Sequence, residues 1–527
     1  MKVLGLNRFK AGSRRVLIRM KHWPDKLFVY EVNTWVWLST LSEEYNRKIT
    51  LENVPDDALD ALAKPGIDMV WLMGIWQRSA YGRQNALRWK HEYRPALPDL
   101  TDEDVIGSAY SIGDYQVDER LGGRAALAAL RLRLRERGVR LMLDYVPNHV
   151  GADHPWTLNP EYCIHGKPED LRQRPNDFYA VTDSKGRQVV VAHGRDPYFP
   201  GWADTAQLNA FSPALRKAVV RTLLDIASQC DSVRCDMAML MTNDIFQNTW
   251  RGYIGARPQQ EYWVEIIPQI KAKYPDFLFV AEVYWNMEFP LLQQGFDFCY
   301  DKTLYDRIIA GDIHQLRQHL VASIDYQKQM MRFIENHDEP RAYAALGAQR
   351  SFPAATLICT LPGATLLHDG QFVGRRVKLP VQIRRQPKEP LNHELEQFYL
   401  RLLKETRDPV YQNGQFYLFD VYPVADDNHT NVNLLVYGWH EPRKDYRLVA
   451  VNLTGTSSAG RVNLSPWSYV DGKRWRLYDV TDGAEYHRHG TEMTRQGLFI
   501  QLDAYESHVF RFQLAEKPAT APLASYP

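Results

Sequence analysis

A chain of 527 residues is too long for one simple core and has the length of a large catalytic domain with smaller attachments. Its hydrophobic share of 45% and charged share of 24% are ordinary for a globular protein. The net charge of +1 gives no basic field that would steer nucleic acid, and no run of about 18 apolar residues predicts a membrane span.

The five cysteines are odd in number and show no CxxC spacing, which argues against a disulfide framework and a zinc site. The segment from Met1 to Met20 contains Lys and Arg but no apolar core, so we expect no signal peptide and a cytoplasmic protein. No GxGxxG motif or P-loop occurs, so we expect no nucleotide cofactor.

Short apolar runs alternate with longer amphipathic stretches from about Leu27 to Asp408. Strand–helix alternation predicts a parallel sheet, and eight candidate strands favour a closed (β/α)₈ TIM barrel over a doubly wound sheet. The candidate strands are Leu27–Val32, Ile67–Leu72, Val139–Tyr145, Ser232–Asp236, Phe277–Glu282, Phe296–Cys299, Met331–Glu335 and Gly363–Leu367.

The clearest helix is predicted over Phe211–Gln229, where Ser212 can cap the first turn and one apolar stripe follows. Gly122–Arg137 and Asn392–Thr406 show the same periodicity. These helices lie between candidate strands, as a barrel requires.

The largest insertion follows the third strand. From Val150 to Gly201 the pattern is irregular and rich in Pro, Asp, His and Gly, with one short candidate strand at Val189–Val191. Loops after barrel strands lie at the face that holds the active site. We therefore expect a subdomain over 150–201, inserted into a barrel formed by 1–149 and 202–409.

After about Val410 the runs become short and β-like, with turn residues between them. This pattern predicts an antiparallel β-sandwich over 410–514. The tail over 515–527 has the composition of a disordered segment. The candidate strands of the sandwich are Phe416–Val421, Val432–Tyr437, Tyr446–Leu453, Trp475–Asp479, Leu498–Leu502 and His508–Phe512.

Four acids stand at corresponding places in the predicted barrel. Asp144, Asp236 and Glu282 end candidate strands, and Asp338 closely follows the seventh strand. For any single position, a salt-bridged structural acid is the better interpretation, because an unpaired buried charge is costly. Four such positions together favour a catalytic site, and glycoside hydrolysis is the chemistry that needs converging carboxylates.

The surroundings of two acids suggest different roles. Asp236 lies two residues after Arg234, so both side chains share one face of the strand and the Arg keeps the Asp ionised, as a nucleophile requires. Glu282 lies among apolar and aromatic residues, which raise a carboxyl pKa and suit a general acid. Glu288 and Glu335 remain alternative acids.

Four segments in order resemble the signature regions of the α-amylase superfamily, glycoside hydrolase family 13. They are Leu143–His149, Val233–Leu240, Val280–Trp285 and Phe333–Arg341. Ala109–Gly123 and Gly201–Arg216 also resemble family segments, so the resemblance covers the barrel and the insertion.

The resemblance implies retention through a covalent glycosyl–enzyme intermediate, with two carboxyl groups about 5–5.5 Å apart. Asp236 would be the nucleophile, Glu282 the acid/base and Asp338 the third carboxylate, which binds hydroxyls of the distorted sugar ring. Asp144 and Asn148 would organise the site from behind. The resemblance also implies that Arg234 braces the nucleophile. It implies substrate contacts by Tyr110, His149 and His337.

Two positions depart from the family pattern. Met239 and Leu240 stand where many α-amylases have a Lys–His pair, which predicts a more apolar leaving-group side and weakens the case for endo-acting starch hydrolysis. Gln207 stands where calcium-binding amylases usually have Asp, and Asn148 offers only a neutral amide oxygen. We expect no tightly held calcium, no other metal and no cofactor; a monovalent ion or a hydrogen bond would fill that role.

Three functions follow from these observations. The leading hypothesis is hydrolysis of α-1,4-glucosidic bonds in maltooligosaccharides or a glycogen-like glucan. The second is a transglycosylase, which transfers the glycosyl unit to a sugar or other acceptor. The third is a non-catalytic glucan-binding protein, disfavoured because all three carboxylates are present. We expect an oligosaccharide or glucan as the binding partner, and no binding to nucleic acid or a membrane. The sequence leaves the oligomeric state open.

Overall fold

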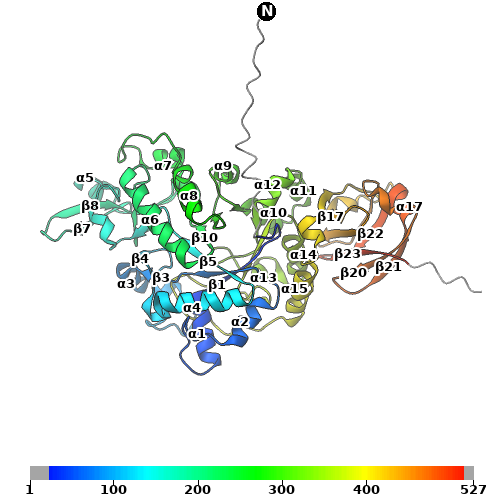
Figure 1. Ribbon diagram of the computed structural model, residues 1–527, viewed down its shortest axis with the longest axis horizontal. Coiled ribbons are helices and arrows are strands. Elements are labelled where there is room, and N and C mark those ends of the chain that lie inside the picture. The colour runs from blue at the N-terminus through cyan, green and yellow to red at the C-terminus, as the bar shows by residue number, and fades with distance from the viewer. Residues whose placement is uncertain (1–22, 516–527) are drawn as a thin grey trace, which may run out of the picture.

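Eight parallel strands close a barrel in the computed structural model, which describes residues 23–515 (Figure 1). Each strand overlaps one of the predicted runs, so the (β/α)₈ prediction is confirmed. The strands are β1 (Phe28–Asn33), β2 (Met69–Met73), β5 (Arg140–Tyr145), β10 (Ser232–Cys235), β11 (Leu278–Ala281), β12 (Phe298–Tyr300), β13 (Met330–Arg332) and β14 (Ala364–His368). The segment 1–22 and the tail from 516 onward lie outside the described residues.

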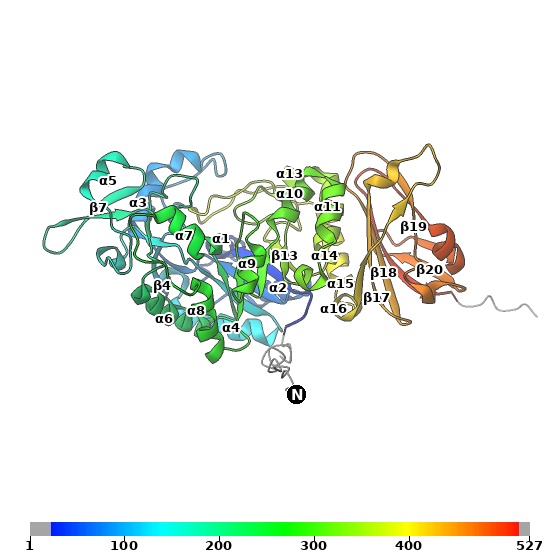
Figure 2. The same ribbon diagram turned by 90° about the horizontal axis from the view of Figure 1, so that it is seen from above.

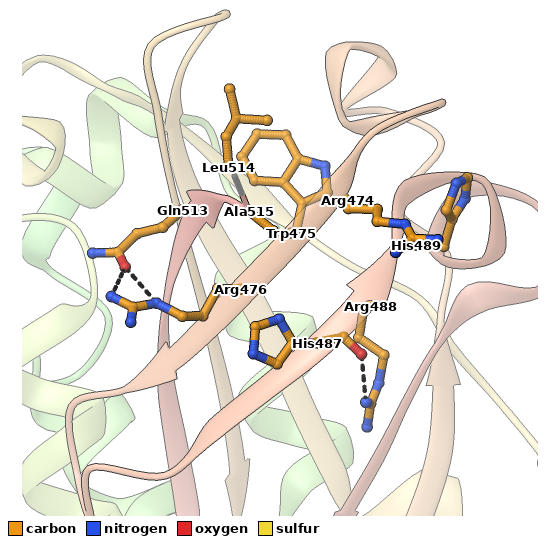
Figure 3. Close-up of a pocket in the computed structure, with 9 residues that line it drawn as sticks. All are labelled: Arg474, Trp475, Arg476, His487, Arg488, His489, Gln513, Leu514 and Ala515. Atoms are coloured by element: carbon orange, nitrogen blue, oxygen red, sulfur yellow. Dashed lines mark hydrogen bonds between the residues drawn. The ribbon is translucent and has the colours of Figure 1, made fainter. Parts of the chain in front are cut away.

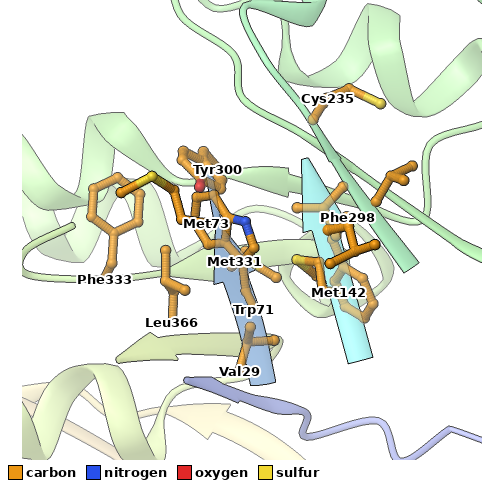
Figure 4. Packing of buried hydrophobic residues seen from close by; sticks show 14 of the residues in the cluster. Val29, Trp71, Met73, Met142, Cys235, Phe298, Tyr300, Met331, Phe333 and Leu366 are labelled. Carbon is orange, nitrogen blue, oxygen red and sulfur yellow. The ribbon is translucent and has the colours of Figure 1, made fainter. Parts of the chain in front are cut away.

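The barrel interior is packed with apolar side chains from facing strands. Figure 4 shows Val29, Trp71, Met142 and Leu366 among the residues that fill it. The parallel register of β10 places Arg234 beside Asp144 of β5. Polar side chains therefore follow the apolar layers toward the carboxyl ends of the strands, where barrel enzymes hold their sites.

The three predicted helices form where the sequence placed them. α6 spans Pro213–Gln229, and the side chain of Ser212 accepts a hydrogen bond from its first turn. α4 spans Gly123–Glu136, and α15 spans His393–Glu405 with Asn392 as its cap. The other helices up to residue 413 are α1 (Thr34–Glu44), α2 (Asp56–Ala63), α3 (Ala80–Arg88), α5 (Pro168–Gln173), α7 (Asn243–Trp250), α8 (Tyr262–Lys273), α9 (Glu288–Gln293), α10 (Lys302–Ala310), α11 (Ile313–Leu320), α12 (Ile324–Lys328), α13 (Ala342–Ala345), α14 (Gly347–Thr360) and α16 (Val410–Asn413).

The inserted segment contains a β-hairpin of β7 (Phe178–Thr182) and β8 (Gln188–Ala192), and the predicted short strand falls within β8. At its base, β6 (His149–Gly151) pairs with β9 (Thr205–Gln207). Figures 1 and 2 place the hairpin at the end of the molecule opposite the C-terminal strands. We propose 150–201 as the bounds of this subdomain, because β6 and β9 join it to the barrel.

The C-terminal part is the predicted antiparallel sandwich. A six-stranded sheet in the order β15-β17-β18-β23-β20-β21 packs on a three-stranded sheet in the order β16-β19-β22, with a separate apolar core. We propose that this domain spans 410–514, as the sequence predicts. Its strands are β15 (Gln415–Leu418), β16 (Val421–Tyr422), β17 (Leu434–Glu441), β18 (Asp445–Asn452), β19 (Ser458–Val462), β20 (Arg474–Asp479), β21 (Glu485–His489), β22 (Leu498–Leu502) and β23 (Ser507–Leu514).

A cavity of about 760 Å³ lies at β20, β21 and the end of β23 in this sandwich (Figure 3). Its lining includes Arg474, Arg476 and Arg488, and Arg476 is held by the side-chain oxygen of Gln513. The cavity belongs to the sandwich and not to the carboxyl end of the barrel, so it is separate from the predicted site. No helix within residues 23–515 has the length and apolarity that a bilayer span requires.

Candidate active site

Arg234 is the centre of a charged cluster at the carboxyl end of the barrel, and its side chain is fully buried. Its Nη1 atom lies 2.5 Å from Oδ1 of Asp236, and its Nη2 atom lies 2.7 Å from Oε2 of Glu282. Oδ2 of Asp338 is 3.8 Å from the same Nη2 atom. Three carboxylates that follow β10, β11 and β13 thus meet around one guanidinium group.

Aromatic rings enclose the buried cation. The guanidinium carbon of Arg234 lies 5.4 Å from the ring centroid of Trp71, 5.2 Å from Tyr110 and 5.8 Å from Tyr300, distances at which a ring face attracts a cation. Burial opposes the charge, but the carboxylate of Glu282 and its neighbours hold the pKa of Arg234 well above its ordinary value. The cluster therefore keeps a permanent positive charge between its acids.

Asp236 presents one engaged and one free carboxylate oxygen. Oδ1 accepts from Arg234, whereas no donor among residues 23–515 contacts Oδ2. The main-chain N–H of Asp236 donates to the main-chain oxygen of Tyr145 in the neighbouring strand β5 at 2.9 Å. This bond fixes the end of β10. A braced carboxylate with one open oxygen can attack an electrophilic carbon.

Glu282 is almost fully buried, and burial raises its pKa to about 7. This value includes the charge of Arg234, which acts to lower the pKa, and the charges of Asp236 and Asp338, which act to raise it. The hydroxyl of Tyr284 donates to Oε1 at 2.8 Å, and the N–H of Met237 donates to Oε2 at 2.6 Å. A carboxyl group with such a pKa can give and take a proton near neutral pH.

Asp338 is the most accessible of the three acids, with 45% of its side chain exposed. Its Oδ2 atom lies 2.9 Å from Nε2 of His337. Desolvation acts against the charge, but His337 and Arg234 hold the pKa of Asp338 well below its ordinary range. The side chain is an ionised acceptor that a sugar hydroxyl can reach.

His337 is buried between two acids. Its Nδ1 atom lies 2.5 Å from Oε1 of Glu31, opposite the contact with Asp338. Burial lowers the pKa of His337, but the two carboxylates outweigh burial and raise it well above its ordinary value. The ring is therefore an imidazolium that donates from both nitrogens.

Glu31 is a member of this cluster that the sequence analysis missed. It is fully buried within β1, where every other side chain is also buried. Burial opposes its ionisation, but His337 lowers its pKa below the ordinary value. The available signal was a single acid inside the apolar run FVYEVN, because a buried charge requires a partner.

Replacing Glu31 by Gln is expected to lower the pKa of His337, since a negative charge that favours the imidazolium is removed. We expect kcat/KM to fall about tenfold, because the Gln amide oxygen can still accept from Nδ1 but a charge-assisted hydrogen bond becomes a weaker neutral one. NMR titration of the imidazole and steady-state kinetics measure the two effects. The exposed Glu52→Gln variant is the control, and an unshifted His337 titration in Glu31→Gln would contradict the assignment.

The predicted Tyr110 and His149 lie near the cluster. The hydroxyl of Tyr110 is 2.6 Å from Nε2 of His337, and the two rings are stacked with centroids 5.3 Å apart. His149 is buried with its ring centroid 5.0 Å from that of Trp202. Burial lowers the pKa of His149, and the charge of Asp236 acts in the opposite direction. Sugar contacts by both residues remain proposals.

Asp144 lies behind the cluster. Its two carboxylate oxygens accept from the indole N–H of Trp71 at 3.0 Å and the main-chain N–H of Gly74 at 2.8 Å. The side chain is almost fully buried, and burial raises its pKa to about 6. These bonds hold β2 and the turn after it in place, and the organising role of Asp144 stays a proposal.

The surroundings of Asn148 do not suit a calcium ion. The side-chain amide N–H₂ of Gln207 donates to both Oδ1 and the main-chain oxygen of Asn148, each at 2.9 Å. The same nitrogen donates to the main-chain oxygen of Leu208 at 3.1 Å. A nitrogen donor thus occupies the oxygen-lined place where a cation would have to lie, and hydrogen bonds join β9 to the barrel there.

Replacing Gln207 by Ala is expected to lower the free energy of unfolding by about 1–3 kcal/mol, because buried carbonyl oxygens lose their donor. Urea denaturation measures this change, and the exposed Gln116→Ala variant is the control with little effect. A chelator is expected to leave the wild-type Tm unchanged. A Tm that falls with chelator and recovers with calcium would show that a cation, not the amide, holds this place.

Neither alternative acid joins the cluster. Glu335 pairs with Arg341 at 3.0 Å and accepts from the N–H of Ala342 at 2.7 Å. Glu288 is buried in the first turn of α9, and burial raises its pKa. Glu335 is thus committed to a structural ion pair, and Glu282 is the acid that contacts Arg234.

The expectation for Met239 and Leu240 was wrong in one respect. Both side chains are buried in the apolar core, so they do not line an exposed leaving-group side. Met237 has a φ of 42°, in the left-handed region, and the chain turns there immediately after Asp236. The apolar pair is therefore a packing feature below the surface.

The sequence of the chain is similar to those of known α-amylases. The family model of the α-amylase catalytic domain matches residues 56–415. The chain is 25% identical over 364 residues to the α-amylase MalA of Haloarcula japonica, a match that covers 67% of this chain and 45% of that protein. It is 22% identical over 384 residues to α-amylase 3 of Dictyoglomus thermophilum, covering 69% and 67% of the two chains.

Among solved structures, the maltogenic α-amylase AmyB of Thermotoga neapolitana superposes with a TM-score of 0.65 at 18% identity, covering 93% of this chain and 99% of that one. At this identity the likeness concerns the fold. The matched range covers most of the barrel, and Asp144, Asp236, Glu282 and Asp338 lie within it. The chain therefore belongs to the α-amylase family of glycoside hydrolases.

Proposed function

We propose that the protein is a retaining α-glycosidase that cleaves α-1,4-linked glucans or maltooligosaccharides by double displacement. The observation that carries this proposal is the contact of one buried guanidinium group, Arg234, with three carboxylates from three strand ends. Glycoside hydrolysis with retention needs a nucleophilic carboxylate beside a protonated one. The α-amylases among the relatives support an α-glucan as the substrate.

In the first step, the free Oδ2 of Asp236 attacks the anomeric carbon, and the bond to the leaving oxygen breaks. The proton of Glu282 passes to that oxygen, so the leaving group departs as a neutral alcohol. Asp338 binds hydroxyls of the distorted ring, and His337, whose two N–H groups face Glu31 and Asp338, orients that carboxylate. The permanent charge of Arg234 lies against the Asp236 carboxylate and balances the negative charge that returns to it when it leaves in the second step.

In the second step, the carboxylate of Glu282 takes a proton from water, and the water oxygen attacks the anomeric carbon. The bond to Asp236 breaks, and the sugar is released with its original configuration. Two inversions at one carbon give net retention. A sugar hydroxyl in place of water gives transfer by the same route.

The test is anomer-resolved NMR of the products from maltoheptaose at early times. We expect the α-anomer to appear first and mutarotation to follow. First formation of the β-anomer would refute the double displacement, and oligomers longer than the substrate would identify a transglycosylase. Absence of turnover on α-linked glucosides would favour a glucan-binding protein.

A further inference from the structure

The cavity of the C-terminal sandwich is lined by basic side chains from two paired strands (Figure 3). Arg474 and Arg476 lie two residues apart on β20, so their side chains leave the same face of the sheet. In the antiparallel register, His489 of β21 stands opposite Arg474, and His487 stands opposite Arg476. Among residues 23–515, no Asp or Glu lines the cavity. These four side chains form a basic patch.

The fold gains little from the basic patch. Like charges directly opposite each other on neighbouring strands are destabilising, and each Arg here stands opposite a basic His. Arg476 contacts Glu485 at 3.2 Å, but the two side chains are 41% and 44% exposed, and such an exposed pair contributes little. Within the described part of the chain, no carboxylate lies within ion-pair distance of Arg474. A negatively charged ligand explains this arrangement better than stability does.

Two other arginines on the same face of this sheet show the contrast. Arg447 of β18 stands opposite Arg511 of β23, and Nε of each donates to the buried Glu405 of α15 at 2.5 Å. Gln513, two residues beyond Arg511, stands opposite Arg476, so these side chains share one face. Where this face packs against the barrel, a carboxylate neutralises its arginines. At the cavity the corresponding charges are left for a ligand.

Two donors of the basic patch are held in position. The side-chain oxygen of Gln513 accepts from Nε of Arg476 at 2.9 Å and fixes the guanidinium group beside the cavity (Figure 3). Nδ1 of His489 accepts from the N–H of Thr491 at 3.3 Å. The neutral ring of His489 therefore carries its proton on Nε2, where it can donate to a ligand. A bound acceptor thus meets donors that are already oriented.

We propose that this cavity binds a phosphate group, either free or as the monoester of a sugar, through Arg474, Arg476 and His489. A phosphomonoester offers three strong acceptor oxygens, and guanidinium groups bind phosphate with two parallel hydrogen bonds. The cavity volume of about 760 Å³ lies in the range of small-molecule sites and leaves room for a sugar beside the phosphate. The site is separate from the cluster around Arg234, and the proposal does not depend on the proposed function.

The test is calorimetric titration of the full chain with glucose 6-phosphate and with inorganic phosphate, at an ionic strength of about 0.15 M to screen distant charges. Glucose, which lacks the phosphate, measures any binding by the barrel. We expect the double variant Arg474→Gln, Arg476→Gln to bind glucose 6-phosphate at least about tenfold more weakly than wild type, because charge-assisted hydrogen bonds are lost. Arg443→Gln is the matched control, since Arg443 is exposed in the turn between β17 and β18, and it should bind like wild type.

The two phosphate probes identify the source of the ligand. Equal affinities would assign the site to free phosphate, and tighter binding of glucose 6-phosphate would assign it to a sugar monoester. Failure of wild type to bind either probe, or equal affinity in wild type and the double variant, would overturn the proposal. A single-stranded oligonucleotide that binds more tightly than both probes, and loses affinity in the double variant, would replace the small ligand by a nucleic acid.

The unliganded Tm separates binding from a structural role. Arg474→Gln removes a positive charge opposite His489, so the Tm of this single variant should not fall. A clear fall would show that Arg474 stabilises the sheet and would overturn the argument for a ligand. Saturating glucose 6-phosphate should raise the Tm of wild type and leave that of the double variant unchanged.

Discussion

Replacement of Asp236 by Gly is expected to lower kcat/KM for maltoheptaose by about 10⁴-fold or more, the effect of removing a catalytic nucleophile. The variant lacks the carboxylate that forms the glycosyl intermediate, and it gains space beside the anomeric carbon. Azide is then expected to attack α-maltosyl fluoride directly and give the β-maltosyl azide. Product NMR identifies the anomer.

Asp338→Asn is the matched control for this experiment, because it removes a carboxylate of the same cluster and keeps Asp236. It should lose activity, since Asp338 no longer binds the ring as an ionised acceptor, but azide should not yield the β-maltosyl azide. Near wild-type turnover by Asp236→Gly would show that another group is the nucleophile.

The sequence predicted much of this cluster because its acids stand at strand ends. Asp236 and Glu282 directly follow β10 and β11, and the closed barrel brings all strand ends to one face. Asp338 was also among the four acids of the strand pattern, although it lies six residues beyond β13, and the family resemblance added the role expected for it. Periodicity locates the ends of strands, and the topology then determines which ends meet.

Other features depend on contacts that periodicity does not record. Glu31 and His337 are distant in sequence and meet only across the closed barrel. The strands β19 and β21, SAGRV and EYHRH, were not predicted because neither has an apolar alternation, and pairing with neighbouring strands defines them. Met239 was placed on the leaving-group side because the family has a Lys at this position, and the family pattern does not show that an apolar side chain there packs into the core.

The pH dependence of the wild-type enzyme should report the ionisation of Glu282. Burial raises the pKa of Glu282 to about 7, and the group must be protonated to release the leaving oxygen. We therefore expect kcat/KM for maltotetraose to be retained below this pKa and to fall as the pH rises through about 7. The α-maltosyl fluoride profile should lack this fall, because fluoride leaves without a proton.

Two variants separate this ionisation from a structural effect of pH. Glu282→Gln should lower kcat/KM for maltotetraose by about 10²–10⁴-fold, the usual contribution of general acid catalysis, and abolish the fall above pH 7. With α-maltosyl fluoride as donor, azide should give the α-maltosyl azide with this variant, because Asp236 still forms the intermediate.

Tyr284→Phe removes a donor that favours the ionised Glu282, so the pH profile of kcat/KM for this variant should shift to higher pH. An unchanged fall in Glu282→Gln would assign the ionisation to a different group. A shift in Tyr284→Phe, together with loss of the fall in Glu282→Gln, would leave Glu282 as the one residue that explains both.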